Sequence, residues 1–371
     1  MAPTFHRPLT IIELCLSPGR GGLEGYAAGL VRDLSARGHR VEVVASPDSE
    51  FAARTQRTPT LTLHGNRYRP LHGVRCLARL ARDADIIHIH RSADLALAVA
   101  AKRLAGNRPA LVYSRHMAIT RDRRKSAIHR LMLGQVDLML TITEQVARAA
   151  RDKLPLPGAR IVALPPGVEV GHERMDCGAV RPPDTDFVVG CFSRIEPAKG
   201  QHELIEALAD LDRDGLTLGA VFAGPVMDRH YAERLHARIE EAGLGDRIRF
   251  MGALADARPA MACCDTVVMP SQNETLGLVL IEAMLLGVPV VATAAGGVLE
   301  VIAHGETGLT YPVGDTEALA HCLTRLAQDE EFRHGLARAG QSFARTRHDR
   351  DGHLERLEQL FYELVPAAQT L

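Results

Sequence analysis

The sequence predicts an α/β protein built from two domains. The chain has 371 residues, more than a single hydrophobic core usually organises. Near its start, an apolar segment at 9–16, a glycine-containing loop at 17–22 and an amphipathic segment at 23–37 precede a second apolar segment at 41–45. This is the order of a βαβ unit. A strand–loop–helix unit at 265–286 repeats the pattern in the other half of the chain, and both units are typical of parallel sheets.

The composition is that of an ordinary globular protein. Hydrophobic residues make up 46% and charged residues 24% of the chain, with a formal net charge of −1, so the overall charge does not favour nucleic acid as a partner. There is no Trp and the aromatic fraction is 4%, which argues against a sugar-binding surface of stacked rings. We recognise neither a membrane-spanning apolar segment nor a signal peptide, and expect a cytoplasmic protein.

The seven cysteines follow no metal-binding or disulfide pattern. None of them forms a Cys-x-x-Cys pair, and several lie in apolar, strand-like segments, where a free Cys behaves as a small hydrophobic residue. We therefore expect a reducing compartment, no disulfide and no structural zinc.

The remaining elements follow from alternating apolar segments and turn residues. An irregular segment at 171–186, which contains Pro182-Pro183, is the expected linker, so the first domain spans 1–180 and the second 181–348. Further strands are predicted in the first domain at 85–90, 110–114, 137–142 and 160–164, and in the second at 187–193, 216–224, 247–250 and 290–293. Helices are predicted at 143–154, 229–242, 316–327, 330–343 and 354–364.

The segment 271–284 carries the strongest functional signal. It leaves an apolar strand, passes through a polar elbow that contains Glu274, and enters an otherwise apolar helix that contains Glu282. The first N–H groups of that helix have no partners within it and favour an anion, and Gly277 lets a ligand approach the backbone. The two carboxylates suit hydroxyl groups, because they accept hydrogen bonds. An anion flanked by hydroxyl-bearing groups describes a nucleotide sugar.

The Glu-x7-Glu spacing of Glu274 and Glu282 resembles the signature of retaining glycosyltransferases of the GT-B fold, family 4. The loop from Arg194 to Lys199 resembles the diphosphate clamp of that family. The resemblance runs in order along nearly the whole chain and includes Gly21-Gly22 as the N-terminal glycine loop, 295–302 and 305–309.

The resemblance implies two Rossmann-like domains that face each other across a cleft, with a final helix at 349–366 returning to the first domain. It implies that Arg194 and Lys199 stabilise the departing diphosphate, that Glu282 binds ribose and that Glu274 binds the sugar. His116, at the end of a predicted strand, would contact the sugar near its 6-hydroxyl. The implied catalytic residues are Glu274, His116, Arg194 and Lys199. The implied donor-binding residues are Gly21, Gly22, Arg194, Lys199, Leu254, Glu274, Thr275, Leu276, Gly277, Leu278 and Glu282.

A basic segment at 121–130 lies between two predicted strands of the first domain, 110–114 and 137–142. Ile128, Leu131 and Met132 supply apolar side chains at helical spacing beside it, a pattern that suits an anionic membrane surface. Two alternatives to membrane binding stay open: the segment is a solvated helix face, or it binds a phosphorylated acceptor directly. The expected acceptor, by resemblance, is a glycolipid or polysaccharide such as lipopolysaccharide, at the cytoplasmic face of the inner membrane. The basic residues are Arg121, Arg123, Arg124, Lys125 and Arg130.

We expect neither a cofactor nor a metal. The Asp-x-Asp triplets at 83–85 and 184–186 fit a metal motif, but such triplets arise easily by chance, and Arg194, Lys199 and the helix N-terminus already supply positive potential. A nicotinamide site is disfavoured because position 24 is Glu, where the Gly-x-Gly-x-x-Gly fingerprint needs Gly.

The predicted reaction is retaining transfer of a hexose from a nucleoside-diphosphate sugar, with a UDP-sugar favoured. Two alternatives stay open: a GT-B-like nucleotide-sugar epimerase, which would act without an acceptor, and a non-catalytic protein that only binds the sugar nucleotide. A pyridoxal-type phosphorylase is disfavoured, since no lysine stands in a Schiff-base context.

Overall fold

A seven-stranded parallel sheet with the order β3-β2-β1-β4-β5-β6-β7 forms the centre of the first unit. This computed structural model describes residues 7–19, 21–56, 58, 60–63, 70–123, 126–156, 158–169, 171 and 175–365. The strands are β1 (Thr10–Cys15), β2 (Arg40–Ala45), β3 (Thr60–Thr62), β4 (Ile86–Ile89), β5 (Ala110–Arg115), β6 (Leu138–Thr141) and β7 (Arg160–Ala163).

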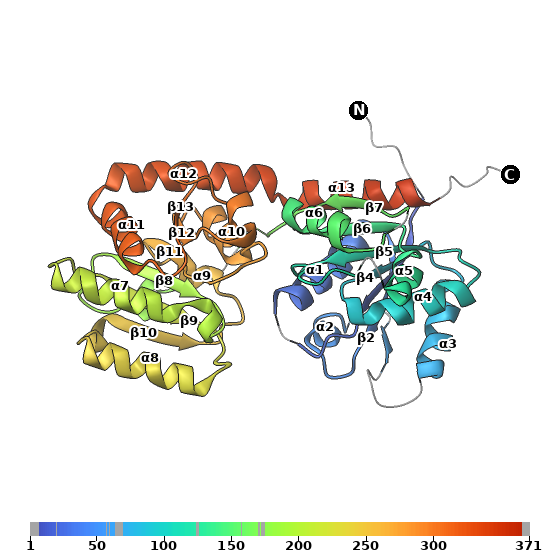
Figure 1. Cartoon of the computed structure of the whole chain (residues 1–371), viewed down its shortest axis with the longest axis horizontal. Helices are drawn as coiled ribbons and strands as arrows, with labels where there is room; N and C mark the ends of the chain where they lie inside the picture. The colour runs from blue at the N-terminus through green and yellow to red at the C-terminus, as the bar shows by residue number, and fades with distance from the viewer. Residues whose placement is uncertain are drawn as a thin grey trace. The chain divides into compact units, whose positions relative to one another are not determined.

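Helices cover both faces of this sheet, which is why its central strands are almost entirely apolar. Successive strand residues point to opposite faces, so Ile11 packs with α1 and α13, whereas Ile12 packs with α3 and α4. Figure 1 shows α13, at the red end of the chain, among the blue and green elements. The helices are α1 (Gly22–Ala36), α2 (Glu50–Arg54), α3 (Pro70–Ala81), α4 (Leu95–Leu104), α5 (Ala127–Leu133), α6 (Glu144–Lys153) and α13 (Arg350–Leu364), with the 3-10 helix η1 (Ser92–Asp94).

The second unit is built on a six-stranded parallel sheet with the order β10-β9-β8-β11-β12-β13. Its strands are β8 (Val188–Phe192), β9 (Gly219–Ala223), β10 (Ile248–Gly252), β11 (Thr266–Met269), β12 (Val290–Thr293) and β13 (Leu309–Tyr311). Its helices are α7 (Gln201–Arg213), α8 (Arg229–Glu241), α9 (Arg258–Met261), α10 (Leu278–Leu285), α11 (Thr316–Gln328) and α12 (Glu330–Arg347). Short 3-10 helices are η2 (Cys177–Ala179), η3 (Pro197–Lys199), η4 (Gly245–Arg247) and η5 (Gly296–Glu300).

Each sheet has one point at which the strand order reverses. In the first unit the chain moves outward from β1 to β3 and then returns to place β4 on the other side of β1. In the second unit the same reversal occurs between β8 and β11. Open parallel sheets bind ligands outside the carboxyl ends of their strands at this switch point, so the loops after β1, β4, β8 and β11 are where a site is expected.

The units divide the chain between Gly167 and Val168 and again between Asp349 and Arg350. Unit 1 comprises Met1–Gly167 with Arg350–Leu371, and unit 2 comprises Val168–Asp349. The segment 168–180, which the sequence assigned to the first domain, therefore belongs to unit 2.

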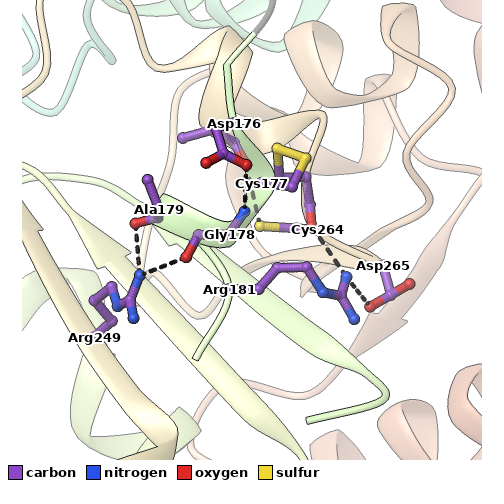
Figure 2. The surroundings of a disulfide bond; sticks show 10 residues. Asp176, Cys177, Gly178, Ala179, Arg181, Arg249, Cys264 and Asp265 are labelled. Atoms are coloured by element: carbon purple, nitrogen blue, oxygen red, sulfur yellow. Dashed lines mark hydrogen bonds and ion pairs between the residues drawn. A yellow bond between two sulfur atoms is a disulfide. The ribbon is translucent and has the colours of Figure 1, made fainter. Parts of the chain in front are cut away.

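Two kinds of contact tie this segment to unit 2. Cys177 forms a disulfide with Cys263, and Arg249 donates to the carbonyl oxygens of Gly178 and Ala179 (Figure 2). The prediction of no disulfide was wrong, because the two cysteines are 86 positions apart and only the fold brings them together.

In the part of the chain that the structure describes, no helix is long and apolar enough to cross a membrane.

Candidate active site

The loops that follow β8 and β11 are held against each other at the switch point of unit 2. Gly200 has φ of +68°, and a Cβ there would lie 1.9 Å from the carbonyl oxygen of Pro270, so only glycine permits this approach. The N–H of Gln272 donates to the carbonyl of Ala198 at 3.0 Å. The backbone thus brings the end of η3 beside the polar elbow that follows β11.

Lys199 and Glu274 meet across these two loops. Lys199 Nζ donates to Glu274 Oε2 at 2.7 Å, and the two side chains are only 17% and 22% exposed. The Glu274 carbonyl accepts from Gly297 N–H at 2.9 Å. A Cβ on Gly296 would lie 2.1 Å from the same carbonyl oxygen, and φ there is +61°. Glu274 is therefore fixed both at its side chain and at its backbone.

Arg194 lies in the same loop but has a different partner. Its guanidinium pairs with Glu196 at 2.8 Å, and its side chain is 51% exposed. Its carbonyl oxygen accepts from the Gln201 side-chain amide at 2.8 Å, which holds the backbone while the side chain faces solvent. The structure thus brings Lys199 and Glu274 into contact and leaves Arg194 nearby with an exposed charge.

The N-terminus of α10 completes this edge of unit 2. Gly277 is its N-cap residue with φ of +82°, a conformation that favours glycine. Thr275 N–H donates to Glu274 Oε1 at 3.3 Å, and Leu276 is buried beside it. Leu278 begins the helix, so its first N–H groups have no partner within the helix.

Glu282 lies one turn further along α10 and is half-buried. Burial raises the pKa of its carboxyl to about 7, although the positive charge of Arg258 acts in the opposite direction. Arg258 itself is engaged by both carboxylate oxygens of Asp256 at 2.8 Å. In the described residues, the Glu282 carboxylate has no hydrogen-bond partner. Its oxygens can therefore accept hydrogen bonds from a ligand.

Leu254 lies two positions beyond β10, the edge strand of this sheet, and is half-buried. The backbone changes direction at Gly252, where φ is +68°. Gly252 O accepts from Gly224 N–H at 2.8 Å, which places this turn beside the loop after β9.

In unit 1, Gly21 and Gly22 are exposed at the start of α1. The Glu24 side chain is buried beneath this loop: a Cβ on Gly19 would lie 3.0 Å from Glu24 Oε1. A carboxylate already occupies the N-terminal turn of the helix, so this loop is better suited to a hydroxyl than to a phosphate.

His116 follows β5 and is linked to a buried polar cluster. Its Nε2 lies 3.3 Å from His90 Nδ1. His90 Nε2 contacts Glu13 Oε2 at 2.7 Å, and His88 Nδ1 contacts Glu13 Oε1 at 2.9 Å. His88 Nε2 lies 2.7 Å from Ser114 Oγ. Among the described residues, Glu13, His88 and His90 form a group with ligand-type atoms within 4.8 Å of one another, and those atoms already bond to one another.

From the sequence we expect one of His88 and His90 to face the cleft and the other the core, but both are buried on the same side of the sheet. Residues two apart on a strand share a face, and both side chains lie on the face that carries Glu13. Sequence reasoning also missed Glu13, whose signal was a carboxylate in the middle of an apolar strand, and Tyr26, whose ring lies edge-on to His116 with centroids 5.2 Å apart.

Comparison with known proteins decides the family. The family model for glycosyl transferases group 1 matches residues 178–343, and that for Glycosyltransferase Family 4 matches residues 20–172. The GDP-mannose-dependent alpha-(1-6)-phosphatidylinositol monomannoside mannosyltransferase of Mycobacterium tuberculosis is 30% identical over 365 residues, covering 88% of this chain and 90% of that protein. The chain belongs to glycosyltransferase family 4.

Two further comparisons extend this result. The lipopolysaccharide core biosynthesis glycosyltransferase LpsE of Rhizobium meliloti is 34% identical over 173 residues, which is 47% of each chain. The crystal structure of Anabaena HepE in complex with UDP-glucose matches with a TM-score of 0.81 and 26% identity, over 96% of this chain and 100% of that one. The predicted α/β GT-B fold of two Rossmann-like domains and the prediction of a hexosyltransferase are confirmed.

The basic segment of this glycosyltransferase is only partly helical. The helix α5 begins at Ala127, after Ser126 caps it. Ile128 and Leu131 are 69% and 58% exposed, whereas Met132 packs against the core. Arg121 and Arg130 are exposed and Arg123 is half-buried. Arg124 and Lys125 lie outside the described residues.

Proposed function

We propose that this glycosyltransferase transfers a hexose from a nucleoside-diphosphate sugar, with a UDP-sugar favoured, to a glycolipid or polysaccharide, with retention of anomeric configuration. The observation that carries the proposal is the Lys199–Glu274 contact of 2.7 Å at the switch point of unit 2. In this contact a cation, which would bind phosphate, lies beside a carboxylate, which would accept from sugar hydroxyls, and both lie next to the N-terminus of α10.

The cations would stabilise the leaving group. When the anomeric C–O bond breaks, negative charge develops on the diphosphate, and preorganised donors lower that barrier. The exposed Arg194–Glu196 pair is worth only about 0–1 kcal/mol, whereas a hydrogen bond to a charged group contributes roughly 1.5–3 kcal/mol. Arg194 can therefore exchange its carboxylate for a phosphate oxygen, while Lys199 bridges the phosphate and Glu274.

The other predicted residues would bind the neutral parts of the donor. Glu274 would accept from sugar hydroxyls and steady positive charge at the anomeric carbon, and Glu282 would accept from ribose. We propose that His116 contacts a sugar hydroxyl, that the backbone of Gly21 and Gly22 approaches the donor, and that the turn at Leu254 lies near the base.

We propose a front-face reaction. The acceptor oxygen bonds to the anomeric carbon on the side from which the phosphate oxygen departs, and the proton of the acceptor hydroxyl passes to that phosphate oxygen. No metal is needed in this scheme, because Arg194, Lys199 and the N-terminus of α10 supply the positive potential.

The nucleobase has two candidates. The Anabaena HepE structure contains UDP-glucose, which favours a UDP-sugar. The Mycobacterium tuberculosis relative is named for GDP-mannose, so GDP-mannose is the second candidate. Calorimetric titration with UDP, GDP, ADP and CDP, first without metal and then with magnesium, discriminates between them. We expect metal-free binding of one nucleotide that is lost in Arg194→Ala; binding of none of the four would contradict the assigned site.

The acceptor proposal rests on two observations. LpsE and the mannosyltransferase LpcC of Rhizobium leguminosarum, both named for lipopolysaccharide core biosynthesis, are 34% and 36% identical over parts of the chain. The exposed Ile128 and Leu131 beside basic residues suit the surface of an anionic membrane. We therefore propose a lipopolysaccharide-type acceptor and peripheral binding at the cytoplasmic face of the inner membrane.

Transfer of radiolabelled sugar to an acceptor extract tests the reaction. Glu274→Ala should abolish transfer and leave the fold intact, while Glu240→Ala, which removes an exposed carboxylate on α8, should not change it. Full activity in Glu274→Ala would refute the assignment. Donor converted to a stereoisomer without acceptor would indicate an epimerase, and donor bound but never consumed would indicate a non-catalytic binding protein.

A further inference from the structure

The buried polar cluster of unit 1 has a defined direction of hydrogen bonding. Glu13, on β1, and His88 and His90, at the end of β4, are at most 2% exposed. They lie on the sheet face that α1 and α13 cover. Burial of a carboxylate is unfavourable unless both oxygens have donors, and here each oxygen faces one imidazole nitrogen.

The donors and acceptors of the cluster can be assigned by starting from Glu13. Burial alone would raise the pKa of its carboxyl, but the contacts with His88 and His90 bring it below its ordinary value, so the group is ionised. An ionised carboxylate only accepts hydrogen bonds. His90 Nε2, at 2.7 Å from Glu13 Oε2, must therefore carry a proton and donate it.

The position of the proton on His90 in turn determines which ring nitrogen of His116 is protonated. Burial lowers the pKa of His90 below its ordinary value, although Glu13 acts in the opposite direction, so the ring is neutral at neutral pH and has a single N–H. Because that N–H is at Nε2, Nδ1 is an acceptor, and the His116 Nε2 at 3.3 Å must donate to it. Burial also lowers the pKa of His116 well below its ordinary value. A neutral His116 with its proton on Nε2 presents Nδ1 as an acceptor.

Neighbouring aromatic groups restrict the rings. Tyr26 lies edge-on to His90, with centroids 6.1 Å apart, and to His116 at 5.2 Å. The Tyr26 hydroxyl lies 3.0 Å from His353 Nε2, and His353 Nδ1 lies 2.8 Å from the carbonyl oxygen of Pro165. Since a carbonyl only accepts, His353 Nδ1 donates. The helix α13 thus holds Tyr26, which in turn packs against both rings.

We propose that Glu13, acting through His90, is a positioning residue that holds His116 with its Nδ1 as a hydrogen-bond acceptor for a hydroxyl of the sugar substrate. The identity of this ligand as the sugar substrate rests on the proposed function. His88 and Ser114 form a second branch from Glu13, and among the described residues no hydrogen bond joins this branch to His116. The cluster is therefore a device that selects which nitrogen of His116 faces the ligand.

The protonated nitrogen of His116 can be observed directly. Two-bond 1H–15N correlation spectra of protein labelled in its histidines distinguish a protonated ring nitrogen from an unprotonated one, and the signals missing in His116→Gln identify residue 116. We expect the proton on Nε2 in the wild type and in the control Ser114→Ala, which alters only the second branch. A proton on Nδ1 would overturn the proposal without any further variant.

Two substitutions of His90 separate its hydrogen bond to His116 from its hydrogen bond to Glu13. His90→Asn has a side-chain oxygen at the position of Nδ1, one bond from Cγ, and so keeps an acceptor for His116. His90→Gln has an amide nitrogen at the position of Nε2, two bonds from Cγ, and so keeps a donor for Glu13. We expect His90→Gln to lower kcat by roughly tenfold, the effect of one lost hydrogen bond, and His90→Asn to retain more activity although it melts at a lower temperature.

Which of the two variants is more active decides whether the cluster positions His116 or only stabilises the fold. If the cluster only stabilised the fold, activity would follow the melting temperature, and His90→Gln would be the more active variant; that result would overturn the proposal. Failure of the proposed function is recognised separately. A wild type that transfers no sugar would refute the function, while the ring-nitrogen spectra would still decide whether Glu13 and His90 fix His116.

Discussion

The carboxyl group of Glu282 is expected to destabilise the folded protein at neutral and alkaline pH. Burial in the folded state raises its pKa from the ordinary value of 4.5 to about 7. The folded protein therefore binds this proton more tightly than the unfolded chain does. Stability contributed by the protonated form is present below pH 4.5 and is lost as the pH rises to about 7. Glu282→Gln, which cannot ionise, should remove this loss.

The expected size follows from the two pKa values. One unit of pKa difference corresponds to about 1.4 kcal/mol, so the change from 4.5 to about 7 sets an upper bound of about 3.5 kcal/mol. Solvent reaches the half-buried carboxylate and reduces this figure. We expect Glu282→Gln to raise the free energy of unfolding by about 2 kcal/mol at about pH 8 and by almost nothing at about pH 4.5.

Urea unfolding of the wild type and the variant at the two pH values measures this difference. Glu240→Gln, an exposed change on α8, is the matched control and should alter neither value by more than about 0.5 kcal/mol. Equal differences at both pH values, or a variant less stable than the wild type at about pH 8, would refute the reasoning. The same variant should bind the nucleoside diphosphate more weakly, since it loses a charged acceptor for ribose; a destabilising group retained for binding is a common trade-off.

Three further predictions concern the site, the disulfide and the basic segment. Gly296→Ala should lower the melting temperature and abolish transfer, because its Cβ would lie 2.1 Å from the Glu274 carbonyl oxygen. Gly305 has a similar φ of +79°, and among the described residues no atom would lie within 4 Å of a Cβ there, so Gly305→Ala should retain transfer. Under oxidising conditions, Cys177→Ser should lower the free energy of unfolding by up to about 4.6 kcal/mol, as expected for a closed loop of this length, and with reductant the wild type should match the variant; no difference in oxidising buffer would argue against the disulfide. Ile128→Asn with Leu131→Asn should weaken sedimentation with vesicles of anionic phospholipid and leave transfer to a soluble acceptor intact; undiminished sedimentation would exclude α5 as the membrane contact.

Local patterns predicted the elements of unit 2 because each signal lies within a few residues. The apolar, β-branched residues before Pro270 predicted a strand, and the apolar segment ended by Gly287 predicted a helix. The structure has β11 and α10 there. What the pattern does not contain is the Lys199–Glu274 contact, because those residues are 75 positions apart. The resemblance to a known family grouped them, and the close approach at Gly200 explains how the backbone joins them.

The error over His88 and His90 and the missed contacts of Glu13 and of the linker have different physical origins. His88 and His90 share a face because of the strand period, a rule that could have been applied from the sequence alone. Their common partner Glu13 is on a neighbouring strand, and strand order cannot be read from periodicity. The Cys177–Cys263 pair likewise depends on tertiary packing. Contacts between segments far apart in the sequence are the information that local propensity does not carry.

The two switch points differ in their chemistry, and under the proposed function each would suit a different part of a nucleotide sugar. In unit 2 the charged groups are partly exposed, and the pairs Lys199–Glu274 and Arg194–Glu196 hold cations that a phosphate can recruit. In unit 1 the Glu13 carboxylate is buried and, among the described residues, bonds to the imidazoles of His88 and His90, so the proposed group at His116 is a neutral acceptor. Water-accessible cations recognise an anion, whereas a neutral acceptor of fixed tautomer recognises a hydroxyl. A nucleotide sugar contains both groups, and changes at Lys199 should therefore weaken binding of the bare nucleoside diphosphate, whereas changes at His90 should affect only the complete sugar donor.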